Sequence, residues 1–336
     1  MEKIYRIIED IYYKCMLMKK DDPNVDSISI IFDGFGYPLA EKFIDYGYDN
    51  SFSIVNYYVP YSIQSNLVNH SKTCSRIIEN ISNSTILINL LNSSSDCTEF
   101  RIAVVQKALG ENMKVLHLPG VSESILLNGL NNLDYSSLHQ RCKIVSTKLE
   151  TTKNIKIISK SCDGNFFELN IPLANRKSHI CGGIAENGEI MNLPTGEAFI
   201  APLENEANGK IVINGSGPSV VFHEKDEVIL SFHNGAINIS ECKFSSTPNG
   251  KRFEQLLLDS SQLDGTLYQI CEFGVGLNDT IKSLTGEIIL DEKMKGTFHI
   301  ALGNNIPFGG NLKSKFHHDL IFVPNEILLD NNKLEV

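Results

Sequence analysis

The sequence predicts an α/β protein built from two parts with different patterns. Its 336 residues exceed what one ordinary hydrophobic core organises, which favours two domains. In the first part, short apolar runs alternate with segments of helical periodicity, as in βαβ units with a mostly parallel sheet. In the second part, short strand-like runs follow one another with turn residues between them. We therefore expect an N-terminal α/β domain over residues 1–154 and a C-terminal, strand-rich α+β domain over residues 155–336.

The N-terminal elements follow from the spacing of apolar residues. Residues 27–32 (SISIIF) form an apolar run closed by the turn D-G-F-G, which predicts a buried strand. Segment 38–47 carries apolar residues at helical spacing and predicts an amphipathic helix. Two further strands are expected at 85–91 and 113–118, with a helix at 99–109 between them. Strands and helices that alternate in this way predict a sheet covered by its crossover helices.

A second long helix is expected at 135–153, and the pattern changes after it. The strands expected beyond that point are 155–159, 166–170, 210–214 and 228–232. Each is short, and turn residues separate them, which is typical of antiparallel strands.

Composition excludes several classes of protein. Hydrophobic residues make up 42% of the chain and charged residues 21%, as in ordinary globular proteins. The net charge of −10 argues against a nucleic-acid partner, because binding phosphates requires a basic patch. No apolar stretch reaches the ~20 residues of a membrane span, and charges interrupt the N-terminus where a secretory signal would be apolar. The eight cysteines form no C-x-x-C pair. We therefore expect a cytoplasmic protein with free thiols.

Histidines near the C-terminus are candidate metal ligands. His299 lies in the alternating run T-F-H-I-A-L-G, which places its side chain on the same side as Thr297 and opposite Phe298. His317 and Asp319 form an H-x-D pair at the start of a strand, so both side chains project to one face. Imidazole and carboxylate together suit zinc, manganese, cobalt or ferrous iron. The spacing alone leaves open a hydrogen-bonded His–Asp pair without metal.

Two glutamates lie in settings rich in glycine. Glu197 follows the turn N-L-P-T-G and precedes an apolar run. Glu272 begins the run E-F-G-V-G-L-N, whose glycines permit close approach of another backbone. This run does not complete G-x-G-x-x-G, because Asp279 takes the place of the last glycine, so a dinucleotide loop is not expected. Taken singly, each glutamate is expected to be a solvated strand end.

Together, these segments resemble a known family. In order along the chain they read N-L-P-T-G-E, E-F-G-V-G-L-N, D-E-K-M-K-G-T-F-H-I-A-L-G-N and S-K-F-H-H-D. This ordered set resembles the M29 family of metal-dependent aminopeptidases. The similarity is greatest to the shorter leucyl aminopeptidase-like members, among which are relatives of 2,5-dihydroxypyridine dioxygenase. It covers residues 155–325 well, and the N-terminal half only in its general α/β pattern.

The resemblance implies a set of metal ligands. On the family pattern, the first glutamate is Glu197, the glutamate that bridges two metals is Glu272, the G-T-x-H histidine is His299, and the H-x-D pair is His317 and Asp319. Three carboxylates and two imidazoles can hold two divalent ions, here expected to be zinc, cobalt or manganese. Such a pair would activate a water to cleave an N-terminal residue or a small amide, with Glu272 as the group that accepts its proton. The resemblance also implies a homodimer.

One position departs from the family pattern and leaves alternatives open. The aminopeptidases carry a tyrosine seven residues after the G-T-x-H histidine, and Ile306 stands there in this chain. Isoleucine cannot donate a hydrogen bond to a developing oxyanion. One alternative is therefore a ring-opening dioxygenase with a single Fe(II) on His299, His317 and Asp319. A second is a relative that binds peptides without cleaving them.

Overall fold

The computed structural model describes residues 2–19, 27–65, 71–81, 83–173, 175–223 and 225–336. The chain forms two compact units. Unit 1 contains residues 1–139 and 183–195, and unit 2 contains residues 140–182 and 196–336. Segment 183–195 therefore leaves unit 2 and returns to unit 1. The domain boundary expected after residue 154 stays a prediction.

Unit 1 is built around a parallel sheet, as predicted. Its strands lie in the order β2-β1-β3-β4-β8, and all pairings are parallel. Their bounds are β1 (Ser27–Phe32), β2 (Ser53–Tyr58), β3 (Ile86–Leu90), β4 (Lys114–His117) and β8 (Ile190–Asn192). The predicted strands at 27–32, 85–91 and 113–118 are confirmed as β1, β3 and β4. The short strand β8 belongs to the returning segment and was not predicted.

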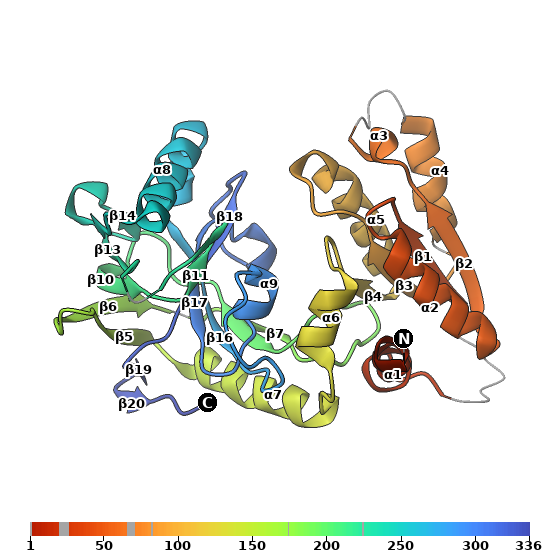
Figure 1. The fold of residues 1–336 in the computed structure, drawn as a ribbon, viewed down its shortest axis with the longest axis horizontal. Coiled ribbons are helices and arrows are strands. Elements are labelled where there is room, and N and C mark those ends of the chain that lie inside the picture. The colour runs from red at the N-terminus through yellow and green to blue at the C-terminus, as the bar shows by residue number, and fades with distance from the viewer. Residues whose placement is uncertain (1, 20–26, 66–70, 82, 174, 224) are drawn as a thin grey trace. The chain divides into compact units, whose positions relative to one another are not determined.

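Helices lie on both faces of this sheet (Figure 1). Their bounds are α1 (Glu2–Asp10), the π-helical turn η1 (Ile11–Cys15), α2 (Tyr37–Asp49), α3 (Tyr61–Gln64), α4 (Ser71–Ile81), the 3₁₀ turn η2 (Ser95–Cys97), α5 (Thr98–Gly110) and α6 (Glu123–Leu130). Phe100 and Val104 of α5 pack on Leu87 and Val115 in one buried cluster. Tyr12 of η1 packs against α2, where its hydroxyl donates a hydrogen bond to the Phe43 carbonyl (2.9 Å). The helices predicted at 38–47 and 99–109 are confirmed as α2 and α5.

Unit 2 contains two antiparallel sheets. The first sheet has the order β14-β13-β10-β6-β5-β19-β20, with β15 paired to β13. Its bounds are β5 (Asn154–Lys160), β6 (Phe166–Pro172), β10 (Asn208–Ile213), β13 (Val228–His233), β14 (Ala236–Ile237), β15 (Lys243–Phe244), β19 (Glu326–Leu329) and β20 (Asn332–Lys333). The four strands predicted between 155 and 232 are confirmed as β5, β6, β10 and β13.

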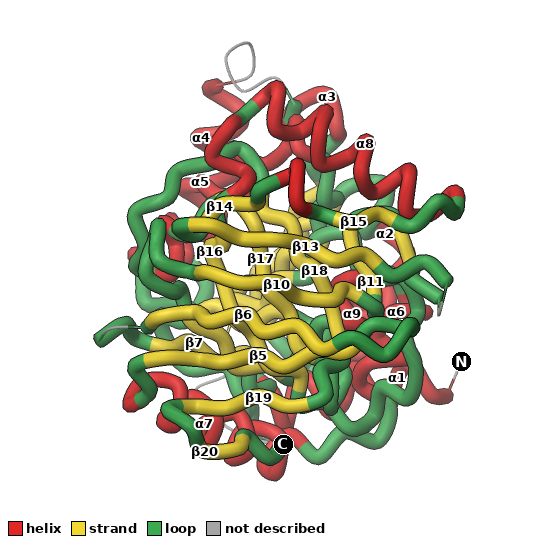
Figure 2. The backbone as a smooth tube through the Cα atoms, turned by 90° about the vertical axis from the view of Figure 1, so that its left-hand side faces the viewer, coloured by secondary structure: helices red, strands yellow, loops and turns green. Residues whose placement is uncertain are grey.

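The second sheet of unit 2 carries the candidate site. Its order is β12-β11-β18-β17-β16-β9-β7. Its bounds are β7 (Ser178–Cys181), β9 (Glu197–Ile200), β11 (Ser216–Gly217), β12 (Val220–Val221), β16 (Ile270–Gly276), β17 (Phe298–Gly303) and β18 (His317–Phe322). The two sheets form adjacent layers, with β10 and β6 in front of β16 and β17 in Figure 2. The central strands β16 and β17 are buried along their whole length.

Helices and turns complete unit 2. They are α7 (Tyr135–Thr151, whose first residues belong to unit 1), α8 (Pro248–Leu263), α9 (Ile288–Asp291) and the 3₁₀ turns η3 (Ile239–Glu241), η4 (Gly265–Tyr268) and η5 (Ile306–Phe308). The helix predicted at 135–153 is confirmed as α7. Among the described residues, no helix is both long and apolar enough to cross a lipid bilayer.

Candidate metal centre

The five residues singled out in the sequence lie on one face of the second sheet of unit 2. Strand pairing places Glu197 of β9 opposite Gly276 of β16, and His299 of β17 opposite Gly274. On β17, Ala301 lies opposite both Glu272 and Asp319. Because paired residues and residues two apart in a strand share a face, all five side chains project to the same side. The chain therefore gathers segments that are far apart in sequence at one place.

A β-bulge gives Glu272 its direction. Ile270 pairs with Leu302, but Glu272 pairs with Ala301, so the register shifts by one residue at Cys271. Without the bulge, Glu272 would share the apolar face of Ile270. The shift turns its carboxylate toward the face that carries His299, and bulges commonly serve this purpose beside active sites.

Glycines on β16 leave space for the functional groups. A Cβ atom at Gly274 would lie 2.0 Å from His299 Nε2, so the imidazole rests directly on this glycine. A Cβ atom at Gly276 would lie 2.2 Å from the Met294 carbonyl oxygen and 2.7 Å from Thr297 Oγ1. The two glycines therefore admit the ring of His299 and the segment that precedes β17.

At the inner end of the site, His299 contacts two carboxylates. His299 Nε2 lies 3.1 Å from Glu272 Oε1 and 3.9 Å from Glu197 Oε2. The histidine side chain is 1% exposed, and its Nδ1 has no hydrogen-bond partner among the described residues. Both glutamates are buried, so the expectation that each is a solvated strand end is wrong. Their places in the middle of a covered sheet account for the difference.

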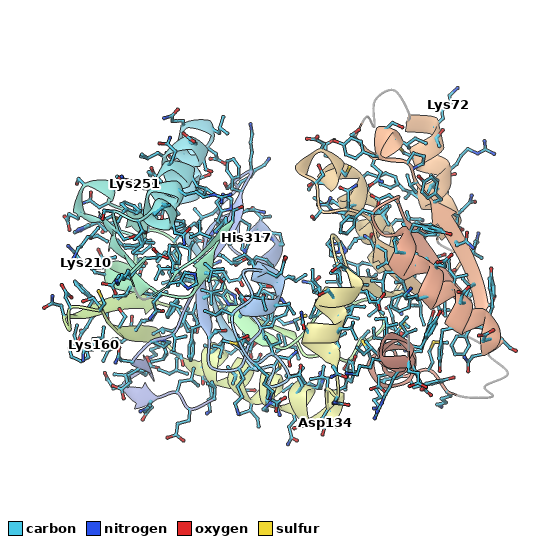
Figure 3. All side chains as sticks on the ribbon, in the orientation of Figure 1. Lys72, Asp134, Lys160, Lys210, Lys251 and His317 are labelled. Carbon is cyan, nitrogen blue, oxygen red and sulfur yellow. The ribbon has the colours of Figure 1, made fainter. Side chains whose placement is uncertain are left out.

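At the outer end, His317 faces the other two carboxylates. His317 Nε2 lies 3.3 Å from Asp319 Oδ1 and 3.5 Å from Glu272 Oε2. The His317 side chain is 30% exposed, and its position on β18 is labelled in Figure 3. His317 Nδ1 lies 3.0 Å from the Asn304 carbonyl oxygen, to which it can donate. That bond leaves Nε2 as the ring nitrogen that faces the carboxylates, and a metal-binding histidine commonly donates its other ring nitrogen to a carbonyl in this way.

The carboxylates control the charge of the two imidazoles. Burial disfavours the charged ring of His299, but the hydrogen bond and charge of Glu272 raise its pKa to about 9. Burial likewise opposes charge on His317, and Asp319 raises its pKa well above the ordinary value. Although burial opposes ionisation of Asp319, His317 in turn lowers the pKa of that carboxyl. Without another cation, the imidazoles therefore take up protons, which a divalent ion would replace.

The donor set fits a divalent metal ion. Among the described residues, Glu272, His317 and Asp319 each offer one ligand atom, and these atoms lie within 4.8 Å of one another. Glu272 presents one oxygen to each histidine, so it can bridge the outer and inner ends. Converging carboxylates and imidazoles are hard and borderline donors, as zinc, manganese and cobalt require.

Two charged residues beside the site were not predicted. Lys293 Nζ lies 3.1 Å from Glu197 Oε1 and also contacts the carboxylate of Glu292. Burial raises the pKa of Glu292 to about 8, and the nearby Lys293 opposes this shift. Burial disfavours the ammonium of Lys293, but Glu197 and Glu292 raise its pKa well above the ordinary value. In sequence, D-E-K-M-K resembles a solvated turn, and only its position before the strand of His299 indicated the site.

Aromatic rings border the outer end. The ring of Phe308 packs edge-on against His317 (5.6 Å between centroids) and against Phe199 (5.2 Å). His179 stacks on Phe199 at 5.5 Å, and burial lowers its pKa. Ile306, which replaces the family tyrosine, lies in the same turn as Phe308 and is 49% exposed. The rings of Phe308 and Phe199 therefore form an apolar surface beside the imidazole of His317.

The chain is similar to a known family and to two solved structures. The family model Peptidase_M29, described as thermophilic metalloprotease (M29), matches residues 135–319. The structure of 2,5-dihydroxypyridine dioxygenase from Pseudomonas putida KT2440 superposes with a TM-score of 0.74 and 16% identity, covering 100% of this chain and 96% of that chain. Wild-type AmpT from Thermus thermophilus gives a TM-score of 0.64 and 12% identity, covering 97% and 94%. No curated protein sequence matches the chain.

At these identities, the two structures establish a shared fold, which agrees with the predicted α/β class. The family match covers more than half of the chain and includes all five candidate ligands. By this match, the chain belongs to the peptidase M29 family of metalloproteases.

Proposed function

We propose that the protein is a metal-dependent hydrolase of the aminopeptidase type, which removes an N-terminal residue or cleaves a small amide. The observation that carries this proposal is the convergence of Glu272, His317 and Asp319 in a member of the M29 family. Two of these donors are carboxylates and one is an imidazole, a set suited to a hydrolytic zinc, cobalt or manganese ion. A divalent ion held there would polarise the scissile carbonyl and lower the pKa of a water.

The chain's own residues have distinct roles in this proposal. Glu272 would bind an ion at the outer end through one oxygen and, where no second ion holds its other oxygen, would accept the proton of the attacking water through it. Asn304 orients His317 by accepting the hydrogen bond from Nδ1, so that Nε2 stays available. Glu197 and His299, together with the inner oxygen of Glu272, form the second set of donors expected for a two-ion site. Whether a second ion binds there depends on Glu197, whose other oxygen contacts Lys293.

The dioxygenase alternative is favoured by Ile306 in place of the family tyrosine and by the similarity of the whole chain to 2,5-dihydroxypyridine dioxygenase. That reaction would need a single iron on two histidines and one carboxylate, here His299, His317 and Asp319. In the part of the chain that the structure describes, the group close enough to share one ion contains Glu272 in place of His299. Two carboxylates and one imidazole favour hydrolysis. The peptide-binding alternative depends only on Ile306.

The resemblance to M29 enzymes supports one further proposal, a homodimer. The cytoplasmic location expected from the sequence stays a prediction. Size-exclusion chromatography with light scattering tests the homodimer. A fusion to a fluorescent protein, followed by fractionation of the cells, tests the location.

The experiment that tests the proposed function compares two reactions with the same protein. The metal-free protein is reconstituted with zinc, cobalt or manganese and assayed on aminoacyl nitroanilides and dipeptides. A second sample is loaded anaerobically with ferrous iron and assayed on 2,5-dihydroxypyridine. Turnover of the amides, lost in His317→Ala, supports the proposal. Ring opening without amide cleavage would replace it with the dioxygenase, and binding of peptides without either reaction would favour the non-catalytic relative.

A further inference from the structure

Lys293 is buried in a way that is unusual for lysine. Its side chain is 1% exposed, whereas Lys160 and Lys251, which are labelled in Figure 3, are exposed residues of unit 2. Burial of an ammonium is costly unless carboxylates pair with it, so lysine is rarely found at such positions without a partner. Lys293 contacts the carboxylates of Glu197 and Glu292. The chain therefore places an ammonium, paired with two carboxylates, inside the candidate metal centre.

The backbone of Lys293 is held firmly in this position. Its amide donates to the Leu290 carbonyl (3.0 Å), and its carbonyl accepts from the Asn278 amide (2.8 Å). Asp291, two residues before Lys293, is fully buried and accepts hydrogen bonds from Ser216 and Thr285. The absence of a side chain at Gly276 lets this segment approach β16. The ammonium is therefore delivered by a rigid segment and not by a flexible surface loop.

Glu197 is shared between this ammonium and the inner histidine. Its Oε1 lies 3.1 Å from Lys293 Nζ, and its Oε2 lies 3.9 Å from His299 Nε2. A divalent ion on the inner donor set would bind Oε2 and so lie close to the ammonium on Oε1. Two cations on one carboxylate repel each other, and the low dielectric of a buried site strengthens that repulsion. Among the described residues, the ion pairs of Lys293 are with Glu197 and Glu292 and not with the outer donor set, which is nearer to solvent.

From this geometry, and on the basis of the proposed metal site, we propose that the Lys293 ammonium is the second cation of the centre. The protein then binds one divalent ion tightly, at Glu272, His317 and Asp319. The inner set of Glu197, Glu272 and His299 binds a second ion weakly, because Lys293 already compensates Glu197. The centre would then hold one divalent ion and one ammonium, in place of the expected pair of divalent ions.

The first test uses the unaltered protein. Metal-free protein is titrated with Mn²⁺ and followed by calorimetry and electron paramagnetic resonance. We expect one tight site per chain, with the six-line spectrum of an isolated Mn²⁺ ion. Two tight sites with the spectrum of an exchange-coupled pair would overturn the proposal. Because this test uses only the unaltered protein, it does not depend on whether a variant folds.

The second test removes the ammonium. In Lys293→Met, and in Lys293→Met combined with Glu292→Gln to preserve the charge balance, the second Mn²⁺ should bind at least ~10-fold more tightly, with a coupled spectrum. Lys295→Met is the matched control, because Lys295 lies two residues away and is exposed, and it should titrate as the unaltered protein does. If the double variant folds and its second site stays weak, Lys293 does not occupy the second cation position.

The metal titration and the amide assay together distinguish failure of the proposed function from failure of the role proposed for Lys293. If neither the unaltered protein nor the variants bind Mn²⁺, both the proposed function and this inference fail. If the unaltered protein binds one ion that His317→Ala loses, but hydrolyses no amide, the inference stands and the proposed function fails. Two tight ions together with amide cleavage would leave the proposed function intact and overturn the role of Lys293.

Discussion

Replacement of Gly274 by alanine tests whether the imidazole of His299 packs directly on the backbone of β16 at this glycine. A Cβ atom there would lie 2.0 Å from His299 Nε2 and 2.1 Å from His299 Cε1. Since carbon atoms in contact need about 3.5 Å, the imidazole must move by roughly 1.5 Å. The moving atom is the one that contacts Glu272, so the shift removes the hydrogen bond that orients this carboxylate. Losing such an orienting bond typically lowers metal affinity by about 10- to 100-fold.

The same substitution also costs stability, by about 1–3 kcal/mol for an overpacked interior. Gly265→Ala is the matched control, because a Cβ atom at that position would meet nothing within 4 Å. Calorimetric titration with Mn²⁺ and thermal unfolding, applied to both variants, separate the two effects. If Gly274→Ala binds the ion as tightly as the unaltered protein and unfolds at the same temperature, His299 does not rest on Gly274 as described.

Three further predictions concern the ligands, the pH and the missing tyrosine. Glu272→Ala should abolish amide cleavage and remove at least one ion, as measured by turnover and elemental analysis; full metal content with normal turnover would contradict its role. The pKa of His299, about 9, lies above its ordinary value of 6.5, so the contribution of His299 to the stability of the metal-free protein is fully present below about pH 6.5 and is lost as the pH rises through 9. The free energy of unfolding should fall by about 3 kcal/mol over that range, and a flat profile in denaturant titrations would refute the assignment. Ile306→Tyr should raise kcat on aminoacyl substrates by about 10-fold or more at unchanged metal content, because the position is exposed enough to accept the ring; an unchanged kcat would show that the position lies outside the reaction.

The elements with regular apolar patterns could be predicted from the sequence. The runs that became β1, β17 and β18 alternate or are continuously apolar, and both edges of each agree with the structure to within a residue or two. The H-x-D pair also projects from one face as its period requires. Local patterns were sufficient in these places, because β1 and β17 are buried on both faces and the apolar second half of β18 is buried as well.

The strand β16 could not be predicted in the same way. Glycine is unfavourable within strands, so E-F-G-V-G-L resembles the end of a strand and not the centre of a sheet. Gly274 and Gly276 are tolerated there because other parts of the chain occupy the space that side chains would fill. The direction of Glu272 depends on a bulge at Cys271, which only the pairing with β17 reveals.

The position of Lys293 was equally inaccessible to local reasoning. Its partner Glu197 lies far earlier in the chain, and the pairing exists only after β9, β16 and β17 have assembled. A charged run such as D-E-K-M-K is ordinarily solvated. The ligands were recognised from the ordered motifs of a family, whereas the cation beside them had to be found from burial and distance.

The metal content of the purified protein tests the central claim most directly. Protein prepared without chelators under anaerobic conditions is analysed for all transition metals, next to His317→Ala prepared in the same way. A divalent ion bound near one per chain, and lost in His317→Ala, is the result that the geometry of Glu272, His317 and Asp319 predicts. If neither protein holds a metal, even after reconstitution, these residues do not form a metal centre.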